Sequence, residues 1–223
     1  STTPMNPKRP AKGASWRAWL RYITWDQWDA IDAEYLGQPQ PPGAPAPRNQ
    51  VVIVLVTAAV VLTGLEYMGS RSFFRSNMPE GLRPEGFKLL AEYAWWSFAC
   101  VVGYLLIPGV IVKTVFKERL RDYGFKGKGF FKHLWIYGLL FLGVLPMVIG
   151  ASLTPAFQAK YPFYKFATRS FFDLAAWEAL YTAQFVALEF FFRGFLLFGI
   201  ARKVGAYAIV IMAVPYCMIH FGK

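Results

Sequence analysis

Five long runs of apolar residues dominate this 223-residue sequence. We place them at 51–68, 89–112, 130–151, 171–200 and from 204 to the end of the chain, with basic, Gly- and Pro-bearing connectors between them. Because a helix needs roughly 20 apolar residues to cross the hydrocarbon of a bilayer, these runs predict membrane spans. We therefore expect an all-α fold, a polytopic transmembrane helix bundle of about five spans.

The composition excludes several other classes of protein. Hydrophobic residues make up 56% of the chain and charged residues 17%, whereas a soluble domain carries about 25% charged residues. Intrinsic disorder, a disulfide-stapled secreted module (there are two Cys) and an ordinary water-soluble enzyme do not fit these values. In a membrane protein the net charge of +11 serves loop orientation and anionic headgroups, so it does not indicate nucleic-acid binding.

The N-terminal part of the chain has a different organisation from the apolar runs. We predict a flexible basic tail at 1–14, an amphipathic helix at 15–36, a stiff Pro-rich linker at 37–48 and the transmembrane domain at 49–223. The helix is too charged to span a bilayer, and its Trp residues suit the headgroup boundary, so we expect an interfacial helix. A helix packed on the protein's own cytosolic face remains an equal alternative.

The basic residues predict how the spans are oriented. With the N-terminus in the cytoplasm, that side carries about twice as many Lys and Arg as the opposite side. We therefore expect the N-terminus inside. We also expect the transmembrane domain to continue beyond residue 223, since the last apolar run is still unbroken there.

Three ionisable residues fall well within predicted spans: Glu189, Arg193 and His220. Such a side chain costs about 2.5–3.5 kcal/mol at membrane depth, so it normally faces the bundle interior and has a function. Glu189 and Arg193 are one helical turn apart and can pair on one face. Glu189 and His220 are equidistant from Val204–Gly205, where we expect the turn of an antiparallel hairpin. The two side chains are thus expected to meet inside the membrane.

A purely structural interpretation of these residues stays open at this point. A buried Glu–Arg pair can neutralise itself and hold two helices together, and a lone histidine can donate a hydrogen bond to a backbone carbonyl. The three charges by themselves do not choose between a structural and a catalytic role.

Two short motifs carry a resemblance to a known family. LEFFFRGF (188–195) resembles the Glu-Glu-x-x-x-Arg motif of the CAAX-protease and bacteriocin-processing family of intramembrane proteases, and PYCMIHFGK (215–223) resembles its aromatic-x-x-x-His motif. Tyr216 takes the aromatic place and His220 the histidine. The basic, Gly-containing stretch RDYGFKGKGF (121–130) is similar to a connector that many members carry.

The resemblance implies intramembrane endopeptidase chemistry. In the family, a glutamate of the first motif activates a water for attack on a peptide carbonyl, and the histidine positions that water and stabilises the oxyanion. On this chain the catalytic residues would be Glu189 and His220, with Arg193 as the charge partner of Glu189. The first glutamate of the motif falls on Leu188, so the base role of Glu189 is our own inference.

The resemblance also bears on cofactors, partners and location. The chain has two histidines and no His-Glu-x-x-His, so we predict neither a metal nor a cofactor, with a metal held by Glu189 and His220 as the lesser alternative. We expect a peptide or protein substrate in a bacterial cytoplasmic membrane. The alternative function is that of an inactive relative, which serves as a structural or accessory subunit of a larger membrane complex.

Overall fold

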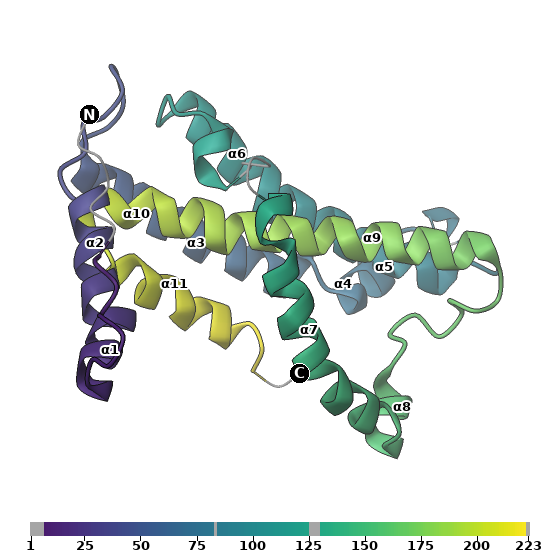
Figure 1. Ribbon diagram of the computed structural model, residues 1–223. Helices are drawn as coiled ribbons and strands as arrows, with labels where there is room; N and C mark the ends of the chain where they lie inside the picture. Colours follow the sequence, from purple (N-terminus) through teal and green to yellow (C-terminus); the bar gives the residue numbers. More distant parts are fainter. Residues whose placement is uncertain (1–6, 83, 125–129, 222–223) are drawn as a thin grey trace. The chain divides into compact units, whose positions relative to one another are not determined.

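The structure is a computed structural model that describes residues 7–82, 84–124 and 130–221, and within these residues it is all-helical (Figure 1). The first six residues of the predicted tail and residues 125–129 of the predicted Gly-containing connector lie outside the described residues. The helices divide into two compact units, which are described separately: residues 1–63, 103–124 and 188–223 form the first, and residues 64–102 and 125–187 the second.

The first unit gathers segments from both ends of the chain. Its elements are α1 (Trp16–Ile23), α2 (Trp25–Tyr35), most of α3 (Pro47–Met68), most of the π-helical η2 (Val102–Leu106), α6 (Ile107–Thr114), η3 (Leu120–Tyr123), the π-helical η4 (Phe190–Leu196), α10 (Leu197–Val204) and α11 (Tyr207–Met218).

The second unit contains the middle of the chain. Its elements are the end of α3, α4 (Arg71–Asn77), η1 (Glu80–Leu82), α5 (Lys88–Val101), α7 (Phe130–Ser152), α8 (Pro155–Lys160) and α9 (Phe171–Glu189) up to Ala187. Its core is built on Tyr93, Tyr164 and Trp177, with Leu90 and Ala167 beside them. Glu92 precedes Tyr93 in the sequence, and its buried carboxylate accepts two hydrogen bonds from Arg75, of 3.0 and 2.7 Å.

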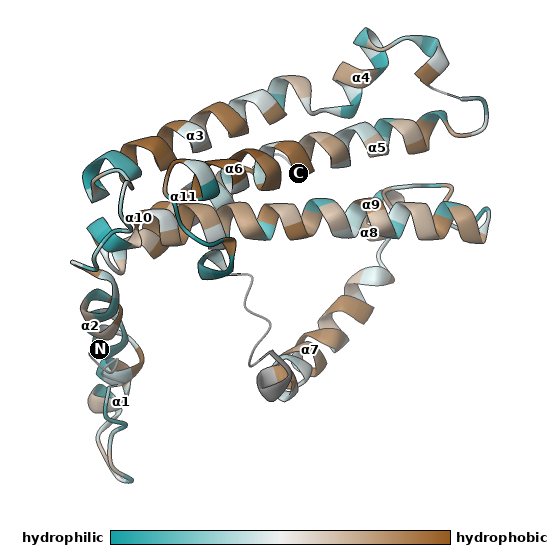
Figure 2. Ribbon diagram, turned by 90° about the horizontal axis from the view of Figure 1, so that it is seen from above, coloured by the Kyte–Doolittle hydropathy of each residue, from teal (hydrophilic) through white to brown (hydrophobic). Residues whose placement is uncertain are grey.

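Four helical stretches are long and apolar enough to cross a membrane: 47–68, 88–114, 134–152 and 171–204. They confirm the first four predicted spans, and hydrophobic residues run along them in Figure 2. Exposed apolar side chains such as Leu139, Phe141 and Met147 (59%, 62% and 74% exposed) need hydrocarbon around them rather than water. The chain is therefore an integral membrane protein.

The fifth predicted span is shorter than the other four. The apolar helix α11 has 12 residues, fewer than the roughly 20 that a span requires. A membrane-crossing role for this helix stays a prediction.

Two π-helical segments interrupt the long helices. Pro108 has no backbone N–H, and in a regular α-helix its ring would clash with the carbonyl four residues earlier. The π-helical η2 ends at Leu106, shortly before this proline. The widened turn accommodates that proline without ending the helix. The second segment, η4, follows Glu189 directly and faces the first: the ring centroid of Tyr104 lies 5.0 Å from that of Phe191.

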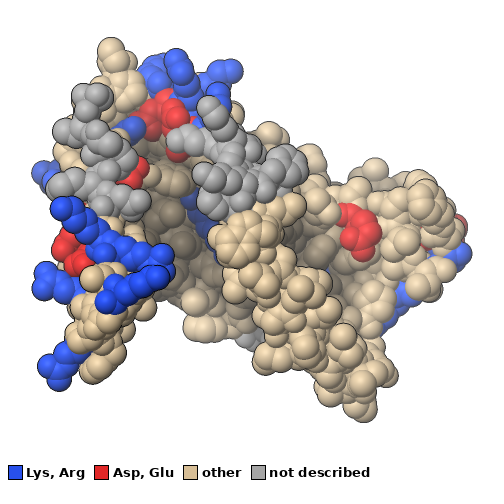
Figure 3. All heavy atoms as spheres, viewed as in Figure 1, with Lys and Arg blue, Asp and Glu red and all other residues tan. Residues whose placement is uncertain are grey.

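The N-terminal amphipathic segment is two helices rather than the single one predicted over 15–36. Thr24 separates them with a non-helical backbone (φ −117°, ψ −88°), and its N–H and its hydroxyl both donate to the carbonyl of Leu20, at 3.1 and 2.6 Å. Lys and Arg side chains gather over these N-terminal helices (Figure 3). Because Thr24 separates them, α1 and α2 can contact different surroundings.

Candidate functional site

Glu189 and Arg193 form the ion pair that their spacing predicts. Glu189 is the last residue of α9 and Arg193 lies one turn further on, within η4. Arg193 Nη1 lies 2.7 Å from Glu189 Oε2. The side chains are 24% exposed for Glu189 and 63% exposed for Arg193, so the pair lies at the edge of the first unit and not in its core.

Tyr216 connects this pair to His220. The Arg193 guanidinium carbon is 6.0 Å from the centroid of the Tyr216 ring, within the range of a cation–π contact. The edge of the Tyr216 ring also meets Phe192 of η4 at 5.2 Å, and its other neighbour is the His220 ring at 5.1 Å. The two sequence motifs thus contact each other through Arg193, Phe192 and Tyr216.

The imidazole of His220 is tied to its own helix. Its Nδ1 lies 2.8 Å from the carbonyl oxygen of Tyr216, and because a carbonyl only accepts, Nδ1–H is the donor. That bond fixes the tautomer of the neutral ring and leaves the lone pair of Nε2 to face outward. His220 is exposed and follows the last turn of α11.

We predicted that the side chains of Glu189 and His220 contact each other directly, and for the described part of the chain this prediction is wrong. Their contacts run through Arg193 and Tyr216, and none joins the carboxylate to the imidazole. The reason is local, since Nδ1 of His220 is held back by the carbonyl one turn earlier. What the symmetry about the turn did predict is that η4 and α11 pack together.

The hairpin turn lies where the sequence predicted it. Helix α10 ends at Val204 and α11 begins at Tyr207. Gly205 adopts a positive φ of 56°, and a Cβ there would lie 1.9 Å from Oδ1 of Asp32, so only glycine fits. The same Oδ1 accepts a 2.7 Å hydrogen bond from the backbone N–H of Ala206 and so satisfies a free donor at the start of α11.

Aromatic packing holds η4 rigidly behind the ion pair. Phe191, Phe192 and Phe195 are fully buried, so this phenylalanine run packs against other helices and does not face lipid. A Cβ on Gly194 would lie 2.5 Å from the carbonyl oxygen of Tyr123, so the absence of a side chain lets the connector approach η4.

A second polar cluster in the first unit was missed by the sequence reasoning. Glu118, 5% exposed, pairs with Arg202 and accepts a 2.6 Å hydrogen bond from the Tyr123 hydroxyl. Gln50, at the start of α3, donates to the same hydroxyl at 3.2 Å. Burial and the hydrogen bond to Glu118 raise the pKa of Tyr123 well above its ordinary value. The partners are 73 and 84 residues apart in sequence, which is why no local spacing could have shown them.

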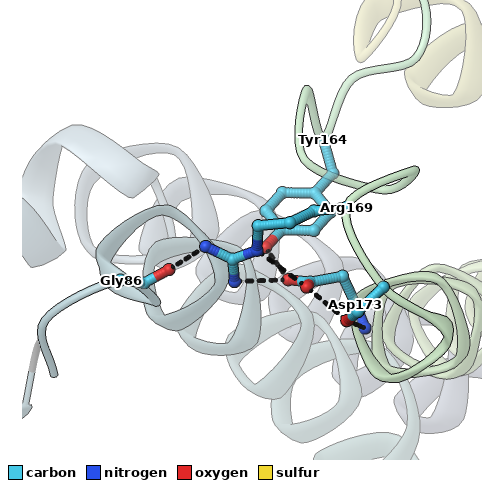
Figure 4. A network of polar contacts seen from close by, with 5 residues as sticks. Gly86, Tyr164, Arg169 and Asp173 are labelled. Atoms are coloured by element: carbon cyan, nitrogen blue, oxygen red, sulfur yellow. Dashed lines mark hydrogen bonds and ion pairs between the residues drawn. The ribbon is translucent and has the colours of Figure 1, made fainter.

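A third cluster, in the second unit, surrounds Asp173 (Figure 4). The Asp173 side chain is 1% exposed. Its oxygens accept hydrogen bonds from the Tyr164 hydroxyl (2.5 Å), from Nε and Nη2 of Arg169 (2.9 and 2.8 Å) and from the Ser170 hydroxyl (2.6 Å). Arg169 also donates from Nη1 to the carbonyl of Gly86 at 2.6 Å.

The pKa values outside the spans follow from these contacts. Burial and the hydrogen bond that it donates to Asp173 raise the pKa of Tyr164 to about 12. The hydrogen bonds to Asp173 also raise the pKa of Arg169. Both shifts keep the protons on the donors, so the Asp173 cluster is a fixed structural network.

The described residues offer no ready-made metal centre. Among residues 7–82, 84–124 and 130–221, no three His, Cys, Asp or Glu side chains come together at one point. The expectation that the site works without a metal stays a prediction.

Comparisons with protein-family models, with curated proteins and with solved structures gave no match to this chain. The class that the fold defines is that of an integral membrane protein with at least four apolar helices of spanning length. The likeness to intramembrane proteases rests on the residues of the two motifs.

Proposed function

We propose that the chain carries the site of an intramembrane endopeptidase of the CAAX-protease-like class. The observation that supports this most is the continuous contact from Glu189 through Arg193 and Tyr216 to His220. It joins both motifs through side chains of three chemical kinds: a carboxylate, a guanidinium and an imidazole. A purely structural ion pair would not need the imidazole.

In the proposed reaction Glu189 is the general base. Its carboxylate takes a proton from a water, the resulting hydroxide attacks the peptide carbonyl, and the proton passes to the departing amine. His220 would hold that water through Nε2, because Nδ1–H is already engaged with the Tyr216 carbonyl. Arg193 orients the carboxylate, and its remaining N–H donors are available to the developing oxyanion.

The N-terminal helices support a finer proposal about the membrane. Trp16, Leu20 and Ile23 of α1 are 70%, 48% and 61% exposed and lie beside basic residues, the combination that suits a headgroup boundary. We therefore propose that α1 lies on the cytoplasmic surface of a bacterial cytoplasmic membrane, with the N-terminus inside. By contrast α2 packs on the protein itself, where Trp28 meets Tyr207 edge-on at 5.5 Å.

The alternative is an inactive relative that acts as a structural or accessory subunit of a larger membrane complex. Leu188, in place of the first glutamate of the motif, and the indirect route between Glu189 and His220 favour it. Under this alternative the Glu189–Arg193 pair only holds η4 in place, and the exposed face of α1 docks on a partner.

The catalytic proposal is tested by counting newly formed peptide termini. Membranes from cells that express the wild type, Glu189→Gln or His220→Ala are compared by mass spectrometry of protein termini. Loss of the base or of the water-holding imidazole should reduce every dependent terminus by about 10²-fold or more. Glu66→Gln, an exposed glutamate on α3, and His133→Ala, the other histidine, are the controls.

Undiminished cleavage in Glu189→Gln or His220→Ala would refute the assigned roles. If the wild type produces no such termini and both variants co-purify with the same larger complex in the same ratio, the accessory function is the right one. Thermal unfolding in detergent establishes that each variant is folded.

A further inference from the structure

A cavity of about 490 Å³ opens in the second unit. The end of α7, helix α8, the loop after it and one face of α9 form its walls. Its volume lies within the roughly 300–1,000 Å³ of ordinary small-molecule sites. Its lining includes Phe157, Tyr161, Phe163, Trp177, Glu178 and Tyr181.

Five aromatic rings follow one another around this cavity. Ring centroids lie 4.5 Å apart from Phe157 to Tyr161 and again from Tyr161 to Phe163, then 6.4 Å from Phe163 to Tyr181 and 5.2 Å from Tyr181 to Trp177. Aromatic faces carry negative partial charge, so rings gathered around one space attract a cation that has shed its water.

The rings are held in place from behind. Trp177 is 6% exposed, with the ring of Tyr93 at 4.8 Å and the ring of Tyr164 at 6.1 Å. Tyr164 is in turn fixed by its hydrogen bond to Asp173. The cluster of Figure 4 thus preorganises one wall of the cavity, which lowers the entropy cost of binding.

Glu178 supplies the acidic group of the lining. It is exposed, lies between Trp177 and Tyr181 on α9, and has no hydrogen bond or ion pair to any other described residue. A carboxylate beside a band of rings adds a full negative charge to the attraction that the rings exert. The lining therefore complements one positive charge.

We propose that this cavity binds a quaternary ammonium group. A primary ammonium such as that of lysine brings three N–H donors that each need an acceptor, and a lining made largely of rings leaves them unpaired. A trimethylammonium group has no donor to satisfy and presents methyl groups to the rings.

The location of the cavity fits a headgroup. The apolar helical stretch from Phe171 to Val204 has 34 residues, so it is about 51 Å long, against about 30 Å of hydrocarbon. Counting about 20 residues back from the basic end at Arg202 and Lys203 brings the other boundary of the hydrocarbon close to Tyr181. The cavity then lies among headgroups, where a quaternary ammonium comes either from a lipid or from a soluble molecule.

The test compares choline with its uncharged isostere, 3,3-dimethyl-1-butanol, by calorimetry on the whole chain in dodecyl maltoside. We expect choline to bind with an affinity about tenfold or more above that of the isostere, because only the charge differs. The N-methyl proton resonances of choline should shift upfield in the ring currents. Equal affinities, or no saturable choline binding, would overturn the proposal.

Two variants and two controls assign the binding to this cavity. Glu178→Gln and Tyr181→Leu should each weaken choline binding about threefold to tenfold. Glu66→Gln, which removes a charge elsewhere, and Phe185→Leu, which removes an exposed ring one turn further along α9, should leave it unchanged. Choline binding that is the same in all four would place it elsewhere and refute the site.

The same assay distinguishes the two sources. In nanodiscs that contain phosphatidylcholine, a headgroup ligand competes and lowers the apparent affinity of choline, whereas phosphatidylethanolamine does not. If neither lipid competes while choline still binds to the cavity, the ligand is a soluble quaternary ammonium.

Discussion

Asp173 and Glu189 are carboxylates on one continuous helical stretch, and each has an arginine partner at the same distance in sequence. The surroundings of the two carboxylates are opposite. Asp173 is 1% exposed and receives hydrogen bonds from Tyr164, Arg169 and Ser170. Glu189 is 24% exposed, and its described partner is Arg193 alone. A carboxylate whose oxygens are saturated by donors can only hold structure, whereas one with spare acceptor capacity can take a proton.

The first test of this contrast between the two carboxylates is the substitution Asp173→Asn. The amide keeps the size of the side chain but places N–H groups against the donors of Arg169 and Tyr164, so we expect the largest loss of stability. The midpoint of thermal unfolding should fall on the order of 5–10 °C. The matched control is Glu85→Gln, which removes an exposed carboxylate paired with Lys88 and should have little effect. Equal midpoints for both variants would contradict a locking role for Asp173.

The second prediction concerns alkaline pH and Tyr164. Its pKa of about 12 in the folded protein exceeds the ordinary 10, so the folded state holds the phenolic proton more tightly than the unfolded state does. The free energy of unfolding that this pKa difference contributes is fully present below pH 10 and is lost as the pH rises through about 12. The stability advantage of wild type over Tyr164→Phe should therefore shrink across this window in thermal melts at several pH values. A constant difference would mean that the hydroxyl does not bind Asp173 in the folded state.

The smallest effect on stability is expected for Glu189→Gln. A partly exposed ion pair contributes about 0–1 kcal/mol, so the unfolding midpoint should move by only about 4 °C or less while processing is lost. Thermal melts of this variant beside Asp173→Asn sharpen the contrast between a functional and a structural carboxylate. A loss as large as that of Asp173→Asn would place Glu189 in the structural class too.

Much of the fold could be predicted from the sequence because hydrocarbon imposes simple length rules. The four longest apolar runs became the four helices of spanning length, and the turn before Ala206 fell midway between the two motifs. The break at Thr24 was not predicted, because it lies in the backbone angles of one residue (φ −117°, ψ −88°). Hydrophobic periodicity carries no signal for a choice of this kind.

The candidate site was predicted less completely than the fold. The i,i+4 spacing of Glu189 and Arg193 was sufficient to predict their pairing, since a helix fixes that geometry. The hydrogen bond from His220 to the carbonyl of Tyr216 in its own helix was not predicted, because no sequence pattern encodes that rotamer. Tyr164 reaches Asp173 from a loop and Tyr123 reaches Glu118 from the connector, so both clusters depend on loop conformations that only the folded chain defines.

The π-helical segment η4 has a consequence for how the end of this helix tolerates length changes. A π turn holds one more residue than an α turn, so η4 takes up a surplus residue, and its loss would restore regular α geometry with α10 facing the same way. Removing Phe198, beyond the π turn, would instead rotate the rest of α10 by about 100° about its axis. Arg202 would swing away from Glu118, and Gly199 from the side chain of Val54. A one-residue deletion, minor in a surface loop, would here exchange the buried and exposed faces of a helix.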